Sequence, residues 1–315
     1  ATYLDVFWIG VINTLIVSFV GIIAATLLGF IMGVFRLSSN VVLRGFATIY
    51  VEILRNIPLL LQIFFWYFLL LNALPEKADR LQIWGDYFGM NKTGFYAPYP
   101  QFFEGFGTVV WALLGAIILA WVVAWFARKR QEATGKQFPT FWVSLAILIG
   151  VPLAAFYAVG APMDFETPSG GNPAPGMVIK PEFIALWLAL ALYTASFIAE
   201  IVRAGILAVA KGQTEASKAL GINPTTTLRK VIIPQAMRVI IPPLTSQFLN
   251  LTKNSSLAIA IAYPDLVSVF AGTALNQVGQ EIEMIFMMMM VYLIISLGTA
   301  AFMNWFNDRM ALVER

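Results

Sequence analysis

Seven apolar stretches recur along the chain, and they constrain its fold more than any other feature. A helix that crosses the hydrocarbon core of a bilayer needs about 20 mostly apolar residues. Stretches of roughly that length lie at 8–35, 57–74, 107–127, 140–160, 182–202, 241–262 and 284–306. The second is short if it is counted from Pro58, so its helix is expected to begin near Ala47. The sequence therefore predicts an all-α fold, a polytopic bundle of transmembrane helices.

The composition supports a membrane protein and excludes several kinds of chemistry. Hydrophobic residues make up 59% of the 315 residues and charged residues 12%, whereas a soluble domain has about 45–50% and about 25%. The chain has no Cys and no His, which removes thiolate nucleophiles, disulfides, Cys/His zinc sites and imidazole acid–base chemistry. The net charge of +3 is too small to indicate a nucleic-acid partner.

Basic residues alternate between the segments that join the stretches, and this predicts the orientation of the chain. Fifteen of the 20 Lys and Arg residues lie in alternate segments, within 36–55, 128–136, 203–238 and 309–315. Because basic residues gather on the cytoplasmic side, we expect the start of the chain outside, and the 203–240 loop and C-terminus in the cytoplasm. An outward-facing start at Ala1 is compatible with a further span upstream. The segments 75–106 and 161–181 then lie outside, and their Gly, Pro and aromatic residues favour irregular loops.

The polar segment Lys211–Ala236 is longer than a simple connection requires. Helix formers run from Gln213 to Leu220, and Gly221 stands where a residue with positive φ would end that helix. Asn223 and Pro224 then fit the cap and first position of a second helix, from Thr225 to about Ile233, which Pro234 is expected to break or kink. The segment therefore predicts a helix–turn–helix on the cytoplasmic face, whose first helix exposes small side chains to another protein.

This loop resembles the signature loop of ABC importer permeases. The pattern is Glu-Ala-x-x-x-x-Gly, then nine residues, then aliphatic-x-aliphatic-Pro, and it is matched here by Glu215, Ala216, Gly221, Val231, Ile233 and Pro234. Ser217 stands where a second Ala is usual. Segments such as YVEILRNIPLLLQIFFWYF, YTASFIAEIVRAGI and LTKNSSLA resemble the polar amino-acid branch over about 8–74 and 182–306. Region 75–180 adds a two-span hairpin, which resembles the permeases of broad-specificity amino-acid transporters.

The resemblance implies a transport cycle with several partners in a bacterial inner membrane. A periplasmic binding protein delivers an amino acid, two homologous permease chains of different sequence form the pathway, and two ATPase subunits each hold one loop helix. The residues implied in coupling to the ATPase are Gln213, Glu215, Ala216, Ser217, Ala219, Gly221 and Pro234. The chain lacks a Gly-x-x-x-x-Gly-Lys-Ser/Thr phosphate loop. We therefore expect no cofactor in it, with ATP and Mg on the partner ATPase.

Polar residues inside two of the predicted spans are candidates for the substrate pathway. Lys253 lies deep in its span, where an isolated charge costs roughly 2.5–3.5 kcal/mol or more, so it should face the interior. The other candidates share polar side chains on the same two spans or at the end of one: Tyr193, Thr194, Ser196, Glu200, Arg203, Gln247, Asn250, Asn254, Ser255 and Ser256. The alternative for the hydroxyls and amides is hydrogen bonding that ties helices together. For Glu200 and Arg203, which are three residues apart, the alternative is an interfacial ion pair.

The first span contains a glycine pair, the last contains a methionine run, and two rival functions fit a chain of this kind. Gly29 and Gly33 indicate close helix packing in the first span, and Met287–Met290 is interpreted as lipid- or core-facing bulk rather than a site. A secondary transporter or channel that works without ATP is the main rival, although repeated halves, which such carriers often have, are not apparent. A membrane-embedded enzyme is the second rival, but Lys253 has no acid–base partner within its own span.

Overall fold

The computed structural model describes residues 3–310 except 77–78, 80, 84–86, 136–137, 162, 167–176, 271 and 273–279. The chain divides into two compact units, one of residues 1–74 and 179–315 and the other of residues 75–178. Helices dominate the described residues, as the apolar stretches predict. This confirms the all-α membrane bundle as the main architecture, with short strands confined to segments near or within the second unit.

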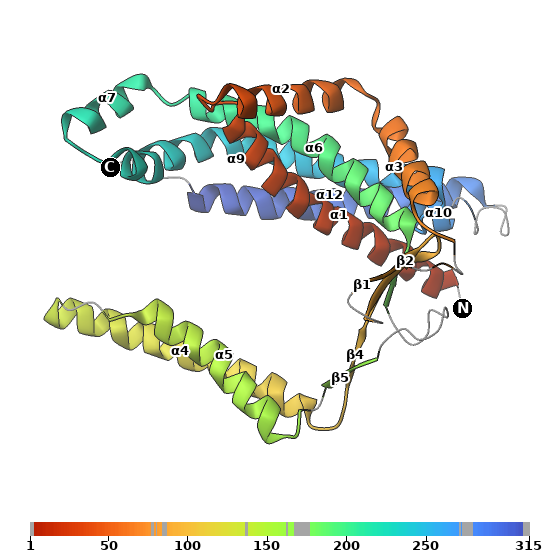
Figure 1. Ribbon diagram of the computed structural model, residues 1–315, viewed down its shortest axis with the longest axis horizontal. Coiled ribbons are helices and arrows are strands. Elements are labelled where there is room, and N and C mark those ends of the chain that lie inside the picture. The colour runs from red at the N-terminus through yellow and green to blue at the C-terminus, as the bar shows by residue number, and fades with distance from the viewer. Residues whose placement is uncertain are drawn as a thin grey trace. The chain divides into compact units, whose positions relative to one another are not determined.

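The first unit is a helix bundle built around α6 (Figure 1). Alanines and β-branched residues give α6 two buried faces, and α1, α2, α3 and α9 all pack against it. In chain order the elements are α1 (Tyr3–Phe35), α2 (Val41–Asn56), α3 (Leu59–Ala73), α6 (Pro181–Leu207), α7 (Lys211–Ala219), α8 (Pro224–Thr227), a π-helical turn (Leu228–Ile232), α9 (Ile233–Asn254), a 3-10 helix (Ser255–Ile261), α10 (Leu266–Val269) and α12 (Glu281–Met310).

Two glycines let α1 approach α6 closely, which confirms the packing predicted from their spacing. A Cβ added at Gly29 would lie 2.5 Å from Cγ2 of Ile198, and one added at Gly33 would lie 2.8 Å from the carbonyl oxygen of Ala199. Ile198 and Ala199 are fully buried. Any larger residue at either glycine must therefore push the two helices apart.

A sharp bend separates α2 from α3 and corrects the expectation of one helix that begins near Ala47. The direction of the chain changes by 108° between the two helices. Ile57 is extended, as a residue before proline tends to be, and Pro58 cannot donate the hydrogen bond that would continue the helix. The buried Gln62 side chain stabilises the break by donating to the carbonyl oxygens of Leu54 at 2.9 Å and Ile57 at 3.0 Å. These bonds satisfy carbonyls that the end of a helix leaves open.

The helices cover all seven predicted stretches but do not all have the properties of a full span. Among the described residues, α1, α4, α5, α6 and α12 are long and apolar enough to cross a membrane, and the bent pair α2–α3 adds a sixth if it counts as one span. The stretch 241–262 falls on α9 and the following 3-10 helix, whose polar residues, Lys253 included, lower its hydropathy. The count of seven spans therefore stays a prediction.

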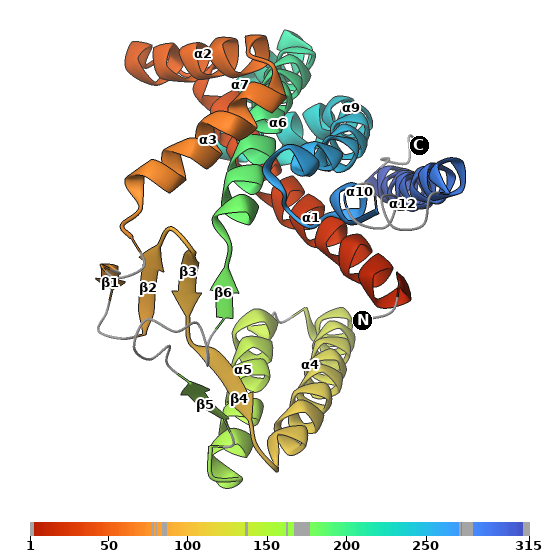
Figure 2. The same cartoon turned by 90° about the vertical axis from the view of Figure 1, so that its right-hand side faces the viewer.

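The second unit contains a helix hairpin and two small sheets, seen most clearly in Figure 2. The helices are α4 (Phe106–Thr134) and α5 (Thr140–Ala158), which pack against each other. One sheet has the order β1-β2-β3-β6, formed by Leu81–Ile83, Phe88–Asn91, Gly94–Ala97 and Met177–Ile179. The other pairs β4 (Tyr99–Phe102) with β5 (Met163–Glu166), with Tyr99 opposite Glu166.

These strands correct the expectation that 75–106 and 161–181 are wholly irregular. A two-residue turn joins β2 to β3, and the Asn91 side chain stabilises it by accepting a hydrogen bond from the Thr93 N–H at 2.8 Å. The pairing of β4 with β5 joins residues more than 60 positions apart. Strands this short show little alternation in the sequence, and their pairing depends on distant residues.

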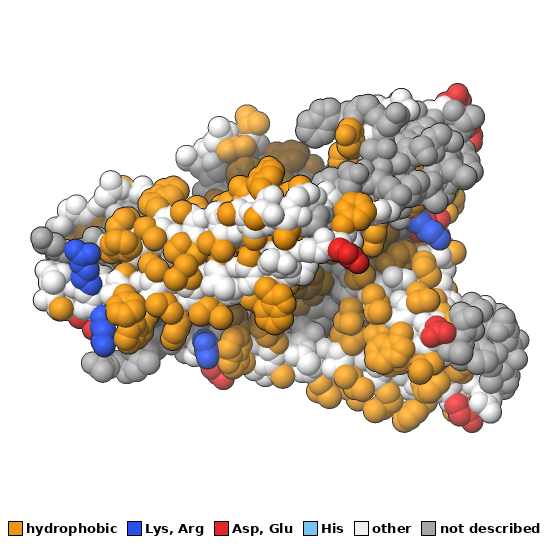
Figure 3. Space-filling model, turned by 90° about the horizontal axis from the view of Figure 1, so that it is seen from below, with side chains coloured by type: hydrophobic (Ala, Val, Ile, Leu, Met, Phe, Trp, Pro, Cys, Tyr) orange, Lys and Arg blue, Asp and Glu red, His pale blue; other side chains and the backbone are white. Residues whose placement is uncertain are grey.

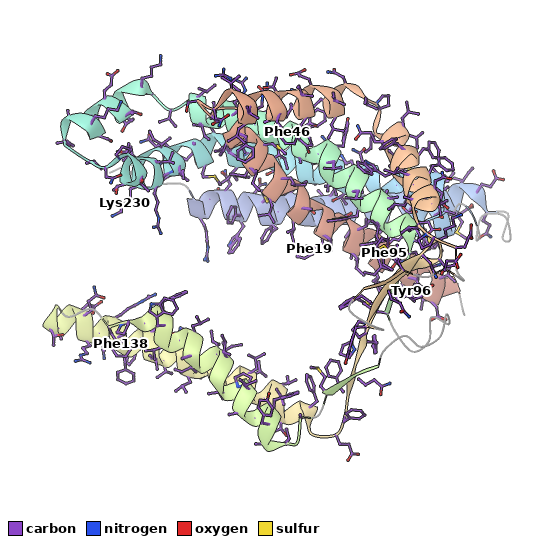
Figure 4. The ribbon with its side chains drawn as sticks, in the orientation of Figure 1. Phe19, Phe46, Phe95, Tyr96, Phe138 and Lys230 are labelled. Atoms are coloured by element: carbon purple, nitrogen blue, oxygen red, sulfur yellow. The ribbon has the colours of Figure 1, made fainter. Side chains whose placement is uncertain are left out.

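Apolar side chains remain exposed over the long helices, as expected of a protein surrounded by lipid (Figure 3). Phe19 on α1 and Phe46 on α2, both labelled in Figure 4, have exposed fractions of 66% and 57%. In a soluble protein such a surface would aggregate, but against acyl chains it has no comparable cost.

Candidate functional site

The predicted coupling segment begins with α7, and its end has the geometry expected at Gly221. Gly221 has φ +68°. Its N–H donates to the carbonyl oxygen of Lys218 at 3.0 Å, and the N–H of Ile222 donates to that of Ser217 at 3.0 Å. This pair of bonds is the Schellman arrangement, which satisfies the last carbonyls of a helix. The positive φ predicted at Gly221 is confirmed, and a side chain with a Cβ would be strained there.

The second helix starts where the sequence indicates but does not end at Pro234. The Asn223 side chain accepts from the N–H of Thr225 at 2.9 Å, and Pro224 occupies the first turn. The chain then passes through the π-helical turn, where the N–H of Ile233 bonds to the carbonyl oxygen of Leu228, and continues as α9. Pro234 lies in the first turn of α9, where its missing N–H is tolerated. The predicted break is therefore a wide turn within a continuing helix.

Most of the predicted coupling side chains are exposed. Gln213, Glu215, Ala216 and Ala219 lie on the surface of α7, and the neighbouring Leu220 is 77% exposed. Ser217 is the exception, because it is buried and its hydroxyl donates to the carbonyl oxygen of Gln213 at 2.8 Å. Figure 1 shows α7 at one end of the first unit, and Figure 4 labels Lys230, on the π-helical turn, at the same end. This surface can receive a partner.

The predicted pair Glu200–Arg203 belongs to a larger ion cluster. Nε of Arg203 donates to a Glu200 oxygen at 3.1 Å, and Arg36 at the end of α1 pairs with the other Glu200 oxygen. Arg36 also lies 3.8 Å from Glu52 on α2. The side chains of Arg36 and Glu200 are only 13% and 28% exposed, so these bonds are worth more than ordinary surface pairs. The cluster ties α1, α2 and α6 together at one end of the bundle.

The predicted hydroxyl candidates mostly bond within their own helices. Ser196 donates to the carbonyl oxygen of Tyr193 at 2.6 Å, Ser255 to that of Thr252 at 2.8 Å and Ser256 to that of Lys253 at 2.7 Å. Thr194, Ser196 and Ser255 are buried. Such back-bonding is what hydroxyls in apolar helices commonly do, so these contacts favour a packing role.

Lys253 and Ser256 line an open cavity of about 620 Å³ beside α12. The amides on the same helix differ in exposure, Asn250 being exposed while Gln247 and Asn254 are half-buried. The remaining lining is mostly apolar and includes Met288, Met289, Met290, Tyr292 and Ser296. Sequence reasoning interpreted the methionine run as bulk and passed over Tyr292 and Ser296. Met288, Tyr292 and Ser296 follow one another at intervals of four residues along one face of α12, and this spacing was the available signal.

A buried carboxylate, Asp265, was also missed. Its Oδ1 accepts from the N–H of Ser268 at 2.8 Å, which caps α10, and its Oδ2 accepts from the hydroxyl of Tyr292 at 3.3 Å. The side chain is fully buried, and burial raises the pKa of Asp265 to about 6. The adjacent Leu266 N–H donates to the hydroxyl of Thr14 at 3.1 Å. The Asp-x-x-Ser pattern of a helix cap was the signal in the sequence.

Comparison with known proteins identifies close relatives over the whole chain. A permease protein for general L-amino acid transport, AapQ of Rhizobium johnstonii, is 50% identical over 317 aligned positions, covering 100% of this chain and 79% of the relative. The putative amino-acid ABC transporter permease YhdX of Escherichia coli is 52% identical, covering 100% and 80%. The glutamate/glutamine/aspartate/asparagine permease BztB of Rhodobacter capsulatus is 44% identical, covering 90% and 73%.

Solved structures share the fold. A chain of an amino acid ABC transporter crystallised with histidines has a TM-score of 0.57 at 21% identity, covering 98% of this chain and 95% of that one. An inward-facing methionine transporter MetNI has a TM-score of 0.53 at 15% identity, with 98% of each chain covered.

Residues 133–312 match a protein family described as "Binding-protein-dependent transport system inner membrane component". Together with the relatives, this match confirms the resemblance found in the signature loop. The chain therefore belongs to the binding-protein-dependent inner membrane components and is a permease subunit of an ABC importer, the part of the complex that does not hydrolyse ATP.

Proposed function

We propose that this chain forms part of the pathway by which an ATP-driven importer moves amino acids, and that segment 211–236 couples it to the ATPase. One observation carries the proposal. The loop is held rigidly by its own hydrogen bonds at Gly221 and Asn223, yet it presents Glu215, Ala216 and Leu220 to solvent. A well-built element with an exposed small and apolar surface is suited to a groove on another protein.

The segment has a direct mechanical connection to the core. The helical path continues from Pro224 through the π-helical turn into α9. On α9, Ile240 is buried against α6 so tightly that a Cβ at Gly205 would lie 2.3 Å from its Cγ1. A displacement of α7 is therefore passed to both α9 and α6 rather than absorbed by a loose loop.

The partners follow from this role. A second, homologous permease chain of different sequence completes the pathway, two ATPase subunits bind ATP and Mg, and a periplasmic protein delivers the amino acid. The complex is located in the bacterial inner membrane. The basic residues at 203–238 and 309–315 favour a cytoplasmic coupling loop and C-terminus, with the start of the chain outside.

The pathway proposal rests on the cavity that Lys253 lines. A cation at the edge of an apolar cavity suits the carboxylate common to all amino acids, and Tyr292 and Ser296 add hydroxyls to its wall. Of the sequence candidates, Lys253 and Ser256 belong to this group, whereas Glu200 and Arg203 hold the ends of α1, α2 and α6 together.

The coupling role is tested in the reconstituted importer with Gly221→Val and Glu215→Lys. Gly221→Val strains the positive φ that ends α7, and Glu215→Lys reverses an exposed charge without touching the core. We expect uptake and substrate-stimulated ATPase activity to fall together while the chain still inserts. Gly212→Ala is the matched control, because Gly212 lies in the same helix with nothing within 4 Å of an added Cβ. Normal uptake in both variants would refute the coupling role.

A second experiment separates this function from its rival. The purified chain, without its partners, is placed in vesicles with a proton or sodium gradient. We expect no accumulation of amino acid, since the motor is absent. Uptake at the rate of the complete complex would instead favour a secondary transporter.

A further inference from the structure

The α4–α5 hairpin of the second unit exposes nearly all of its apolar surface. Within the most apolar 18-residue window of each helix, only 11% of α4 and 0% of α5 is buried. Large side chains such as Trp121, Phe141 and Trp142 are about two-thirds exposed. In a membrane, these helices are therefore available for contact with lipid.

One end of the hairpin contains a small cavity, and the described residues that line it are apolar except for one charged side chain. Its volume is about 270 Å³, and Val123, Phe126, Ala127 and Arg130 line it from α4. These residues recur every three or four positions, so they form one face of the helix. Phe138, which lies just before α5 and is labelled in Figure 4, also lines the cavity.

The surroundings of the cavity are strongly basic. Arg128, Lys129 and Arg130 are consecutive and exposed at this end of α4, with Glu132 the neighbouring acid. Lys129 lies over the ring of Trp125, with Nζ 4.5 Å from its centroid. A tryptophan with basic residues beside it is typical of the boundary between acyl chains and headgroups. The positive charge is therefore located where a bilayer presents its phosphates.

We propose that this end of the hairpin binds an anionic phospholipid, with its phosphate on Arg130 and part of an acyl chain in the cavity. A guanidinium forms paired hydrogen bonds to phosphate oxygens, which makes it well suited to this headgroup. The cavity is slightly smaller than the pockets that enclose a whole small ligand, so it suits a segment of a chain. Basic pockets on the cytoplasmic side are a known mode of lipid binding. That this end of the hairpin lies on the cytoplasmic side of the membrane rests on the orientation given under the proposed function.

The test uses the intact importer complex and native mass spectrometry. The complex is equilibrated with phosphatidylglycerol or phosphatidylcholine, and the bound lipids are counted. We expect the wild type to retain phosphatidylglycerol preferentially and Arg130→Gln to lose most of that preference. Val123→Phe, which fills the cavity without changing charge, should lose it as well. Arg309→Gln is the matched control, because Arg309 lies over Trp305 at 4.6 Å at the end of α12 and is remote in sequence.

Each outcome decides the proposal. Equal retention by wild type and Arg130→Gln overturns it. If Arg309→Gln lowers retention as much as Arg130→Gln while Val123→Phe has no effect, the attraction is diffuse charge rather than a site, and the proposal is wrong. Displacement of the lipid by inorganic phosphate alone would point to a free-phosphate site instead. The counts need no transport, so a failure of the proposed import function leaves them unaffected. Single cysteines introduced at 130 and 220 of this cysteine-free chain test the orientation separately.

Discussion

The buried charge of Asp265 makes a prediction about stability and pH that the structure allows us to quantify. In the unfolded chain this carboxyl loses its proton near its ordinary pKa of 3.8, whereas burial raises the pKa in the folded protein to about 6. Between those values the folded state binds more protons, so stability is greatest below the lower pKa and falls as pH rises through the upper one. The difference between the two pKa values corresponds to about 3 kcal/mol of folding stability, which is lost by neutral pH.

Asp265→Asn should remove most of that cost. The amide oxygen can still accept from the N–H of Ser268, because Asn is as good a helix cap as Asp. The hydroxyl of Tyr292 can accept from the new amide NH₂ instead of donating to a carboxylate. We therefore expect the variant to be more stable than the wild type at neutral pH by about 1–3 kcal/mol. The difference should shrink as the pH falls towards 4.

The assay is thermal unfolding of the purified complex in detergent at several pH values. Between about pH 5 and about pH 7, the wild type should lose about 1 kcal/mol relative to Asp265→Asn. Asp308→Asn serves as the matched control, since it removes the same charge from an exposed position on α12. If the wild type and Asp265→Asn follow parallel curves over this range, the carboxyl does not titrate as burial requires and the reasoning is refuted.

Packing and charge also determine the expected effects of three other substitutions. Gly33→Ala should destabilise the protein by about 1–3 kcal/mol through overpacking, as measured by melting. Gly150→Ala is the control, because nothing lies within 4 Å of a Cβ added there, and it should be neutral or gain up to about 1 kcal/mol of stability. Glu200→Gln should cost about 1–3 kcal/mol of stability, again measured by melting, because it leaves the mostly buried Arg36 side chain without its main partner. Lys253→Met should slow import by about 10- to 100-fold without releasing the ATPase, and unchanged transport kinetics would remove Lys253 from the pathway.

Features that depend on local chemistry could be predicted from the sequence. The apolar stretches locate the helices because a span must be about 20 residues long. Gly221 and Asn223 mark the turn between α7 and α8, since their conformations are set within a few residues. Gly29 and Gly33 predict close packing but not the partner, which the structure identifies as α6.

Features that depend on distant residues could not be predicted. β4 pairs with β5 across the whole α4–α5 hairpin, and no local pattern indicates such a pairing. The cavity beside Lys253 is formed largely by α12, so its lining depends on how two helices dock. Arg36, which completes the Glu200 cluster, is more than 160 positions away in the sequence. The bend at Pro58 is different, because its local signal was present and the apolar run that continues through it outweighed it.

Two contacts near the C-terminal end of α6 explain why the proposed motion of the coupling loop should move helices as bodies rather than bend them. In the first contact, Glu200 links α6 to Arg36 of α1. One turn further on, Gly205 admits the buried Ile240 of α9, so that helix is fixed to the same region. Both contacts lie close to the point where the chain enters segment 211–236, and both are buried enough to resist sliding. A force on α7 therefore acts on α1, α6 and α9 together. Packed interfaces of this kind shift between discrete arrangements instead of deforming gradually.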